Sequence, residues 1–293
     1  MAILGTGAMA RQWAGRCGAL NPLIVGEAPP PYHIHDHSGE RIISPLHLTW
    51  QDAPPKSPEI VLLSIKWRSM EKARQWIKEW APHSLVISLM NGMGQEEALA
   101  NIPGITLSAG ITTMAATRRD TNDERHTYLK AEGSTMVAAT HHPLERHLMA
   151  ANENGQWGWH WASANEAQLF RWQKLVQNSI INPLTALADC PNGDLPAHPL
   201  WRLAPRLAQE AGTVAMALGV KLPQNMLERV EKLLRQTHEN ISSMLQDVRE
   251  GRETEVFAIN GYLVQQGSQL AIPPPTHQAL LSIISALTPV TPL

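Results

Sequence analysis

The sequence predicts an α/β domain with a parallel sheet, followed by an all-helical domain. In the first half of the chain, short apolar runs alternate with helix-compatible segments, as they do where crossover helices connect parallel strands. In the second half the apolar residues recur every three or four positions, which is the period of a helix. Because the period changes near Asn165, we expect one domain over residues 1–163 and a second over residues 164–293.

The predicted strands are mostly apolar, which is typical of strands covered on both faces. They are MAIL (1–4), PLIV (22–25), IVLLSI (60–65), SLVISL (84–89), ITLSAGITT (105–113), STMVAAT (134–140) and QWGWHWAS (156–163). The last strand would place Trp157, Trp159 and Trp161 on one side of a pleat. The predicted helices lie within residues 166–180, 200–219, 225–249, 254–270 and 276–287.

The composition favours a soluble globular protein with a small-molecule partner. Hydrophobic residues make up 43% of the chain and charged residues 17%, and a net charge of -2 gives no general attraction to nucleic acid or membrane. Two cysteines, Cys17 and Cys190, provide neither a disulfide framework nor a cysteine-rich metal site. With no spanning apolar run and no signal peptide, we expect a cytoplasmic protein. The apolar helical half is compatible with a monomer or a homodimer.

A glycine-rich turn, GTGAMA, directly follows the first predicted strand. It fits the dinucleotide-binding fingerprint, with Gly5 for the tight turn, Gly7 for close approach of a pyrophosphate and Ala10 at the third position. The N-terminus of the following helix would stabilise the negative charge of the phosphates. We therefore expect the whole turn to bind a nucleotide: Gly5, Thr6, Gly7, Ala8, Met9 and Ala10.

The second predicted strand is followed by Glu27, about 20 residues beyond the fingerprint, where an acid can bind a ribose hydroxyl. No lysine or arginine comes after Glu27 until Arg41, so the usual partner of a 2′-phosphate is not evident. An acid at this position without a basic partner favours NADH over NADPH. A Glu27 that simply faces solvent would explain the acid equally well.

Histidines are concentrated in the segment YHIHDHSGER, where His33, His35 and His37 would share one face of a strand. Such a face can bind a metal ion, but three histidines in a polar hairpin are more often solvated. The predicted site therefore includes no metal.

Two polar residues follow predicted strands directly. Lys66 comes after IVLLSI and Asn91 comes after SLVISLM, at strand ends where open α/β sheets bind ligands. A lysine that snorkels to solvent and a turn-forming Asn-Gly pair would explain the same positions without a ligand.

A polar arc lies in the helical segment KLVQNSIINPLTAL. Lys174, Asn178 and Asn182 recur every fourth residue and share one side of a helix. A solvated helix face would also explain them, but Leu175 and Ile181 flank the arc, which favours a buried site. A lysine in a desolvated site can donate a proton to a carbonyl oxygen.

Two other residues bear on this helix. Glu255 is a candidate partner for Lys174, because a buried ammonium needs an acidic partner, although a charged first helical turn accounts for Glu255 almost as well. Pro183 has no backbone N–H to donate, so we expect it to kink or end the helix after Asn182.

Several segments together resemble the ketopantoate reductase (2-dehydropantoate 2-reductase) family. They are GTGAMA at 5, IKW at 65, NGMG at 91, WQKLVQNSIINPLTAL at 172, CPNG at 190, SSMLQDVREGRETEV at 242, INGYLVQQG at 259 and IPPPTHQALL at 272. They occur in family order across nearly the whole chain. The resemblance implies an N-terminal Rossmann-type domain with a doubly wound sheet and an all-helical C-terminal domain.

The activity implied by this resemblance is NADPH-dependent reduction of the ketone of 2-dehydropantoate to (R)-pantoate, a step toward pantothenate and coenzyme A. By motif position, Lys174 resembles the catalytic lysine that protonates the ketone oxygen, and Glu255 resembles the site glutamate. The resemblance assigns the substrate to Asn91, Asn178, Asn182, Asn192 and Ser243. It assigns the cofactor to residues 5–10, Lys66, Asn91, Ala116 and Glu255.

The chain departs from the family pattern at four places. Ala10 is the third fingerprint residue, and the basic residue after the second strand is replaced by Ala28 and prolines, which keeps NADH as an alternative cofactor. Phe257 stands where the family usually has an acid, and Met114 where a histidine is common. Two alternatives follow, a paralogous reductase of another branched 2-oxo acid and a catalytically silent NAD(P)-binding protein.

Overall fold

The computed structural model describes residues 1–152 and 157–288, and the chain divides into two compact units. The first unit comprises residues 1–90 and 95–167, and the second comprises residues 91–94 and 168–293. The division falls inside one long helix, between Ala167 and Gln168. The short segment 91–94, which follows a strand of the first unit, is grouped with the second.

The first unit contains an eight-stranded sheet of order β12-β11-β8-β7-β6-β1-β2-β5. Its strands are β1 (Ala2–Leu4), β2 (Leu23–Val25), β5 (His47–Leu48), β6 (Ile60–Leu63), β7 (Leu85–Ser88), β8 (Thr106–Thr112), β11 (Thr135–Ala138) and β12 (Trp159–Ala162). Neighbours from β5 to β8 are parallel, whereas β11 is antiparallel to β8. The predicted doubly wound sheet is confirmed, and each predicted strand is present within it.

The last predicted strand is shorter than expected. Trp159 and Trp161 lie in β12, but Trp157 precedes it, so only two of the three tryptophans alternate along the strand. Trp157 instead packs edge-on against Trp159, with ring centroids 5.4 Å apart. Gln156, the first residue of the predicted segment, lies outside the described residues.

Strand β1 lies where the strand order reverses. The chain passes from β1 to β2 on one side and returns to β6 on the other. Beyond the strand ends, the Gly5 amide donates to the Val25 carbonyl (2.8 Å) and the Ser64 amide to the Leu4 carbonyl (3.0 Å). Such a switch point, at the carboxyl ends of parallel strands, is where open α/β sheets bind ligands.

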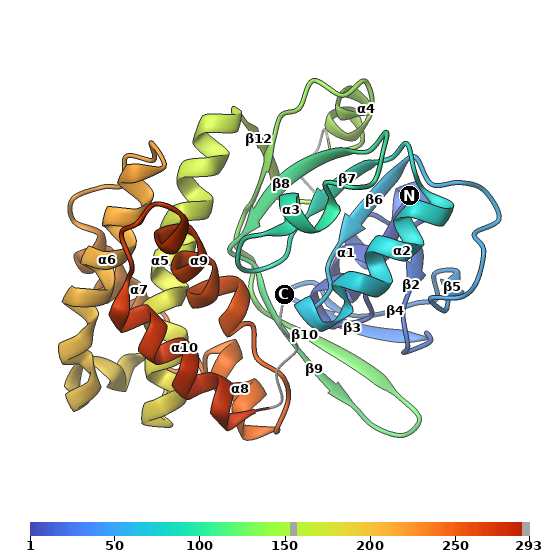
Figure 1. Ribbon diagram of the computed structural model, residues 1–293. Helices are drawn as coiled ribbons and strands as arrows, with labels where there is room; N and C mark the ends of the chain where they lie inside the picture. The colour runs from blue at the N-terminus through green and yellow to red at the C-terminus, as the bar shows by residue number, and fades with distance from the viewer. Residues whose placement is uncertain (153–156, 289–293) are drawn as a thin grey trace. The chain divides into compact units, whose positions relative to one another are not determined.

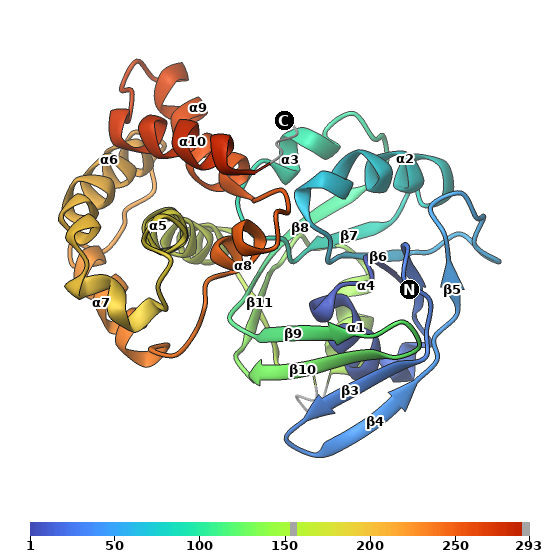
Figure 2. The ribbon, with the colours of Figure 1, turned by 90° about the horizontal axis from the view of Figure 1, so that it is seen from below.

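Helices cover both faces of the larger sheet, and Figure 2 shows α2 (Met70–Trp80) on one side and α1 (Ala8–Arg16) on the other. Trp13 of α1 is fully buried in a core with Ile3 of β1 and Ile24 of β2. The short helices α3 (Gln95–Leu99) and α4 (Leu144–Ala151) also belong to this unit. Alternate apolar side chains of each strand therefore reach the helices on opposite faces.

A second, four-stranded sheet of order β4-β3-β10-β9 packs on α1. Its strands are β3 (Tyr32–Asp36), β4 (Gly39–Ile43), β9 (Ala115–Asp120) and β10 (Arg125–Ala131). Tyr32, Ile34 and Thr127 are fully buried on the side of α1, whereas the alternate residues are polar. The strands of the larger sheet were predicted from continuous apolar runs, which strands with one polar face do not have. Of the smaller sheet, only the strand that carries the histidines was therefore considered in advance.

The second unit is helical, and α5 is its central helix in Figure 2. Its elements are α5 (Ala164–Ala188), the 3₁₀ segments η3 (Asn192–Ala197) and η4 (Pro199–Leu203), α6 (Ala204–Ala217), α7 (Met226–Gln236), α8 (Ser243–Arg249), the π-helix η5 (Phe257–Gly261), α9 (Tyr262–Gln269) and α10 (Pro275–Leu287). Figure 1 labels the main helices from yellow to red. The all-helical character predicted from the apolar period is confirmed.

The predicted helix 225–249 is two helices, α7 and α8. The carbonyls of His238 and Asn240, between them, accept backbone hydrogen bonds from Gly193 and Asn192 rather than continuing a helix. Ser242 then starts α8 as an N-cap, with its Oγ accepting from the Leu245 amide (3.1 Å). The break is therefore made by long-range partners, which helical periodicity does not reveal.

Of the two outcomes expected at Pro183, the structure excludes a helix end, because α5 continues to Ala188. A proline removes the hydrogen bond to the carbonyl four residues earlier, which here belongs to Ser179. That carbonyl accepts instead from Nδ2 of Asn260, at 3.0 Å. A side chain distant in the sequence thus supplies the donor that Pro183 lacks.

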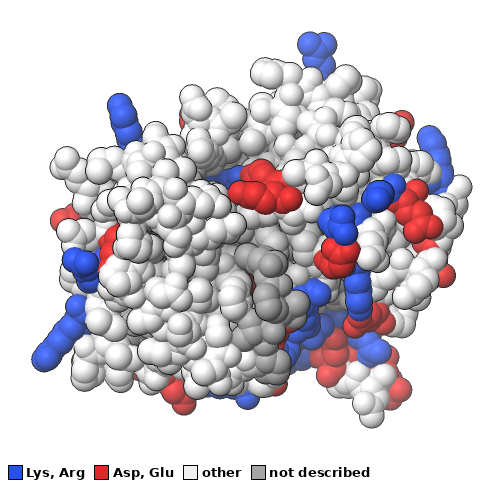
Figure 3. All heavy atoms as spheres, in the orientation of Figure 1, with Lys and Arg blue, Asp and Glu red and all other residues white. Residues whose placement is uncertain are grey.

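Charged side chains of both signs are interspersed on the face drawn in Figure 3, without a continuous area of either sign. This distribution agrees with the net charge of -2. Within the part of the chain that the structure describes, none of the helices is both long and apolar enough to cross a membrane.

Candidate active site

The turn after β1 has the backbone geometry that its two glycines predict. Gly5 has φ of +116°, and a Cβ at this position would collide with the carbonyl oxygen of Ser64. Gly7 is the N-cap of α1, and a Cβ there would meet none of the described atoms within 4 Å. Gly5 is therefore required by the fold, whereas the open side of Gly7 leaves room for a phosphate group.

The other turn residues follow from the same geometry. Thr6 lies between the two glycines, and Ala8 and Met9 begin α1. Ala10, at the third fingerprint position, is fully buried in the core of the first unit. A small residue at this position allows the helix to pack closely on the sheet.

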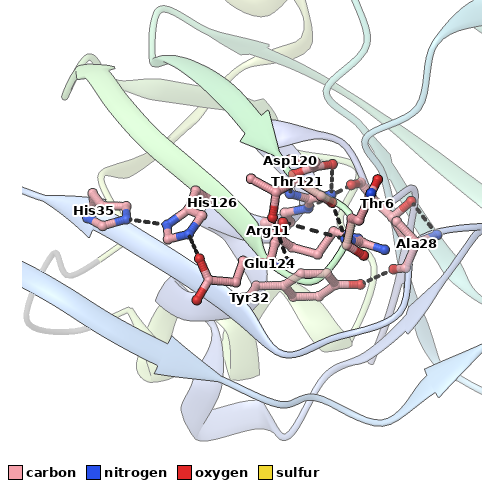
Figure 4. A network of polar contacts seen from close by, with 11 residues as sticks. Thr6, Arg11, Ala28, Tyr32, His35, Asp120, Thr121, Glu124 and His126 are labelled. Atoms are coloured by element: carbon pink, nitrogen blue, oxygen red, sulfur yellow. Dashed lines mark hydrogen bonds and ion pairs between the residues drawn. The ribbon is translucent and has the colours of Figure 1, made fainter.

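Arg11 holds this turn in place, and the sequence alone did not indicate it. Its Nε donates to the Thr6 carbonyl (2.9 Å), and its two terminal nitrogens donate to the Asp120 carboxylate of β9 (2.6 and 2.9 Å). The guanidinium also lies 4.9 Å from the ring centroid of Tyr32, whose hydroxyl donates to the Ala28 carbonyl (2.5 Å). Figure 4 shows this network around the turn.

Asp120 is held in its charged form by this network. Burial alone would raise the pKa of Asp120, but its hydrogen bonds and ion pair with Arg11 outweigh burial and lower it. A bidentate arginine–carboxylate pair with no exposed guanidinium is strongly directional. Arg11 and Asp120 therefore hold the Thr6 carbonyl in a fixed position.

Glu27 follows β2 and is exposed, and its carboxylate pairs with Lys72 of α2 at 2.8 Å. The hydrogen bond and charge of Lys72 lower the pKa of Glu27, with a further contribution from the charge of Arg68. Lys72 of α2 and Arg68 of the 3₁₀ helix before it therefore place positive charge near Glu27, although no basic residue closely follows Glu27 in the sequence. An exposed ion pair of this kind contributes little to stability and can rearrange readily.

Lys66 and Ala116 are the other predicted cofactor residues of the first unit. Lys66 is half-buried just beyond β6, where it is the N-cap residue of the short 3₁₀ helix Trp67–Ser69. Ala116 is half-buried within strand β9 rather than in a loop, because it pairs with Leu129 of β10. Met114, just before β9, is a core residue of this unit.

In the second unit, Lys174 is half-buried in α5 and Glu255 is buried before the π-helix η5. Burial lowers the pKa of Lys174 to about 8, and the negative charge of Glu255 partly opposes this effect. The lysine is thus mostly protonated at neutral pH, yet is a far better proton donor than an ordinary lysine.

Asn91 is brought to Glu255 by the segment 91–94. Nδ2 of Asn91 donates to Oε2 of Glu255 at 3.4 Å, and the Met93 amide donates to the Ala258 carbonyl at 2.9 Å. Gly92 has φ of +78°, and a Cβ there would lie 2.5 Å from the Ala258 oxygen. Only glycine permits this close approach, so the NGMG motif serves to attach Asn91 to the region of Glu255.

Asn178 and Asn182 extend the Lys174 side of α5, with Asn178 half-buried and Asn182 buried. Near the end of this arc, Oγ1 of Thr185 donates to Oγ of Ser242 at 2.7 Å. This bond ties the start of α8 to α5, and half-buried Ser243 is the first residue of α8.

Asn192 is placed by contacts to a different segment. Its Nδ2 donates to Oγ1 of Thr237 at 2.9 Å, and its backbone amide donates to the Asn240 carbonyl at 2.9 Å. Its Oδ1 is buried and has no hydrogen-bond partner within residues 1–152 and 157–288. The Oδ1 of Asn192 is therefore a buried acceptor that these described residues leave unsatisfied.

A buried network of hydrogen bonds attaches α5 to its neighbours, and the sequence alone did not indicate it. Nδ2 of Asn260, within η5, donates to the Ser179 carbonyl and to Nδ1 of His277, each at 3.0 Å. Nε2 of His277 in turn donates to the Leu207 carbonyl (3.0 Å), and burial lowers the pKa of His277. A neutral His277 thus fixes Asn260, and Asn260 joins α5 to the helix that follows Glu255.

The fold and the glycine turn define a Rossmann-type nucleotide-binding protein with a helical second unit. A family model described as "Ketopantoate reductase PanE/ApbA" matches residues 1–141, and one described as "Ketopantoate reductase PanE/ApbA C terminal" matches residues 166–288. The chain belongs to the ketopantoate reductase family and is an oxidoreductase.

Curated relatives are similar over almost the whole chain. The 2-dehydropantoate 2-reductase of Yersinia pestis is 30% identical over 296 residues, which covers 96% of this chain and 93% of the relative. The enzyme of the same name from Salmonella typhimurium strain LT2 is 31% identical over 293 residues, with the same coverage of 96% and 93%.

Solved structures show the same fold at lower identity. A PanE/ApbA family ketopantoate reductase from Ralstonia eutropha JMP134 has a TM-score of 0.85 and 20% identity, over 98% of both chains. D-Mandelate dehydrogenase, in a ternary structure with NADH and anilino(oxo)acetate, has a TM-score of 0.85 and 19% identity, also over 98% of both chains. The fold is therefore shared with solved proteins of more than one name.

Proposed function

We propose that the protein reduces the ketone of 2-dehydropantoate to (R)-pantoate with a hydride from NADPH, in pantothenate and coenzyme A biosynthesis. The proposal rests mainly on Lys174. Burial lowers the pKa of this lysine to about 8, although the nearby Glu255 carboxylate partly opposes the effect. The family membership supplies the substrate class, because the Yersinia pestis and Salmonella typhimurium relatives are named 2-dehydropantoate 2-reductase.

Lys174 is the proton donor in this proposal. Hydride addition to a ketone builds negative charge on its oxygen, and a positioned ammonium stabilises that charge more strongly in the transition state than in the ground state. Nζ of Lys174 then transfers a proton to the oxygen. Glu255 keeps the lysine protonated at neutral pH, and Asn91 holds the Glu255 carboxylate.

The amides and the hydroxyl of the second unit hold the substrate in this proposal. Asn178 and Asn182 continue the Lys174 side of α5 and offer amide donors to a carboxylate. Asn192 offers the free acceptor Oδ1 to a hydroxyl, and the Ser243 hydroxyl can donate or accept. Reduced nicotinamide supplies the hydride when bound.

The turn of residues 5–10 is the proposed cofactor-binding segment. The open side of Gly7 at the start of α1 fits a pyrophosphate, and Arg11 holds the Thr6 carbonyl between the two glycines. We also assign Lys66 and Ala116 to this site, together with Asn91 and Glu255.

We propose NADPH as the cofactor because Lys72 and Arg68 place positive charge beside Glu27. A lysine ammonium that leaves an exposed carboxylate can bind a 2′-phosphate instead. NADH is the alternative, in which Glu27 binds the ribose hydroxyls and Lys72 stays paired with it.

A steady-state assay tests the function. The rate at which reduced nicotinamide is oxidised is measured with 2-dehydropantoate, for NADPH and for NADH. The proposal predicts that the wild-type protein, with Lys174 and Glu255 intact, reduces 2-dehydropantoate. It also predicts a higher kcat/KM with NADPH than with NADH. A folded protein that turns over neither cofactor with this substrate contradicts it, and calorimetric binding of NADPH without turnover would indicate a catalytically silent NAD(P)-binding protein.

A second candidate is reduction of another branched 2-oxo acid. It is favoured by Phe257, an aromatic residue where the family usually has an acid, placed two residues beyond Glu255 and half-buried in the π-helix. A panel of branched and aromatic 2-oxo acids separates the two candidates. A kcat/KM that is higher for another member of the panel than for 2-dehydropantoate would support the second.

A further inference from the structure

The outer face of the smaller sheet carries a cluster of imidazoles and carboxylates that the proposed reductase site does not use. His33 and His35 project from the same face of β3, because they are two residues apart. The neighbouring strands add His126 of β10, which is the register partner of His33, and Glu40 of β4, which is the register partner of His35. Two sequence segments about 90 residues apart thus contribute side chains to one small area.

The donor atoms of this cluster lie near one another, so small movements of the side chains would let them share one ion. Ligand atoms of His33, Glu40 and His126 all lie within 4.8 Å of one another. Nδ1 of His33 is 2.7 Å from Oε1 of Glu40, and Nε2 of His35 is 2.9 Å from Nδ1 of His126 and 3.9 Å from Oε1 of Glu40. Ligands that bind zinc at about 2.0–2.2 Å in a tetrahedron stand roughly 3–3.5 Å from each other.

The contacts of His126 direct the lone pair of its Nδ1 toward the cluster, where this lone pair accepts from Nε2 of His35. Nε2 of His126 is 3.0 Å from Oε2 of Glu124, and Figure 4 shows His126 between Glu124 and His35. Because a carboxylate only accepts, the neutral imidazole carries its hydrogen on Nε2 and its lone pair on Nδ1. A carboxylate that holds the outer N–H of a histidine is the usual support for a metal-binding imidazole.

The strands hold these side chains rigidly. Tyr32 and Ile34 alternate with the two histidines along β3, and Thr127 follows His126 in β10. The side chains of Tyr32, Ile34 and Thr127 are fully buried on the side of α1. The side chains of His33, His35 and His126 are 16%, 25% and 18% exposed. The cluster is therefore fixed from behind yet open to an ion from solvent.

We propose that His33, Glu40 and His126 bind one transition-metal dication of the zinc class, with His35 as a fourth donor beside them. Imidazole nitrogen with one carboxylate oxygen suits Zn²⁺ or Co²⁺, whereas Mg²⁺ prefers oxygen ligands alone. Binding displaces the hydrogen between His33 and Glu40 and breaks the hydrogen bond between His35 and His126, and His35 becomes a donor to the ion when its hydrogen moves from Nε2 to Nδ1. The contact between His126 and Glu124 stays intact. The ion then joins β3, β4 and β10, so it should stabilise the folded first unit.

The test is titration of the full-length chain, without an affinity tag, with Zn²⁺, Co²⁺ and Mg²⁺. We expect one Zn²⁺ per chain by calorimetry, a visible Co²⁺ absorption band of a low-coordinate site, no Mg²⁺ binding, and a higher thermal unfolding midpoint with Zn²⁺. Glu40→Gln and His126→Ala should each weaken Zn²⁺ binding at least tenfold, since losing even a supporting group of a metal site costs about 10–100-fold.

His37→Ala is the matched control. His37 is a neighbouring histidine with a side chain that is 76% exposed, and its recorded ionic contact is a 3.8 Å approach to Glu132 outside the cluster. Zn²⁺ affinity that is the same in the wild type, Glu40→Gln and His37→Ala would overturn the proposal, as would equal binding of Mg²⁺. Glu40 is half exposed, so Glu40→Gln tests the site even where His126→Ala does not fold. None of these readouts depends on reductase activity.

Discussion

Raising the pH is the sharpest perturbation of the proposed proton donor. Burial lowers the pKa of Lys174 from 10.5 to about 8, although Glu255 partly opposes it. At about 1.4 kcal/mol for each tenfold change in an ionisation constant, this fall corresponds to roughly 3 kcal/mol in favour of the neutral amine. Only the ammonium can donate a proton, so kcat/KM should be constant at neutral pH and fall about tenfold per pH unit above about 8.

The assay is the pH dependence of kcat/KM for 2-dehydropantoate at saturating NADPH, over roughly pH 6 to 10, since this quantity reports the groups of the enzyme before the substrate binds. Glu255→Gln removes the negative charge that raises the pKa of Lys174. In that variant the loss of activity should therefore begin at a lower pH than in the wild type.

Lys174→Ala provides the control. It should lower kcat by about a hundredfold or more, and its residual rate should lack the decline above pH 8. A wild-type kcat/KM that shows no decline up to about pH 10 would refute the argument from burial. A decline that stays in place or moves to higher pH in Glu255→Gln would refute the role of the glutamate.

Three further predictions concern the cofactor and the fold. Lys72→Ala should raise the KM for NADPH about tenfold and leave that for NADH nearly unchanged, with Lys78→Ala on the same helix as the control; equal effects on both cofactors would contradict a 2′-phosphate contact. Asn260→Ala should cost about 2–3 kcal/mol in the free energy of unfolding by urea, because it removes the donor to two buried acceptors, and a cost below about 0.5 kcal/mol would contradict this. Gly5→Ala should unfold at a lower temperature than the wild type, whereas Gly7→Ala should fold normally and lose NADPH binding by calorimetry.

The sequence predicted the larger sheet and the polar arc because each has a local signature. Buried parallel strands such as β6 are continuous apolar runs, and α5 repeats Lys174, Asn178 and Asn182 at helical spacing. The smaller sheet escaped prediction because its strands have one polar face. β9, with the sequence AATRRD, carries arginines and an aspartate that read as a loop until β10 is placed beside it.

Long-range partners account for most of what local patterns did not reveal. Arg11 and Asp120 are 109 residues apart in the sequence, and Asn91 and Glu255 are 164 apart. Neither pair has a spacing signal, so their contacts follow only from the fold. The sequence likewise does not show that α5 continues past Pro183, because the replacement donor comes from a distant segment.

Hydride transfer from reduced nicotinamide to the ketone carbon is the central claim, and isotope labelling tests it most directly. NADPH carrying deuterium at the transferable position of the nicotinamide is incubated with 2-dehydropantoate and the wild-type protein, and the product is analysed by mass spectrometry. The account predicts (R)-pantoate with one deuterium on its hydroxyl-bearing carbon, at a rate that Lys174→Ala lowers about a hundredfold or more. Absence of pantoate, or pantoate without deuterium at that carbon, would contradict it.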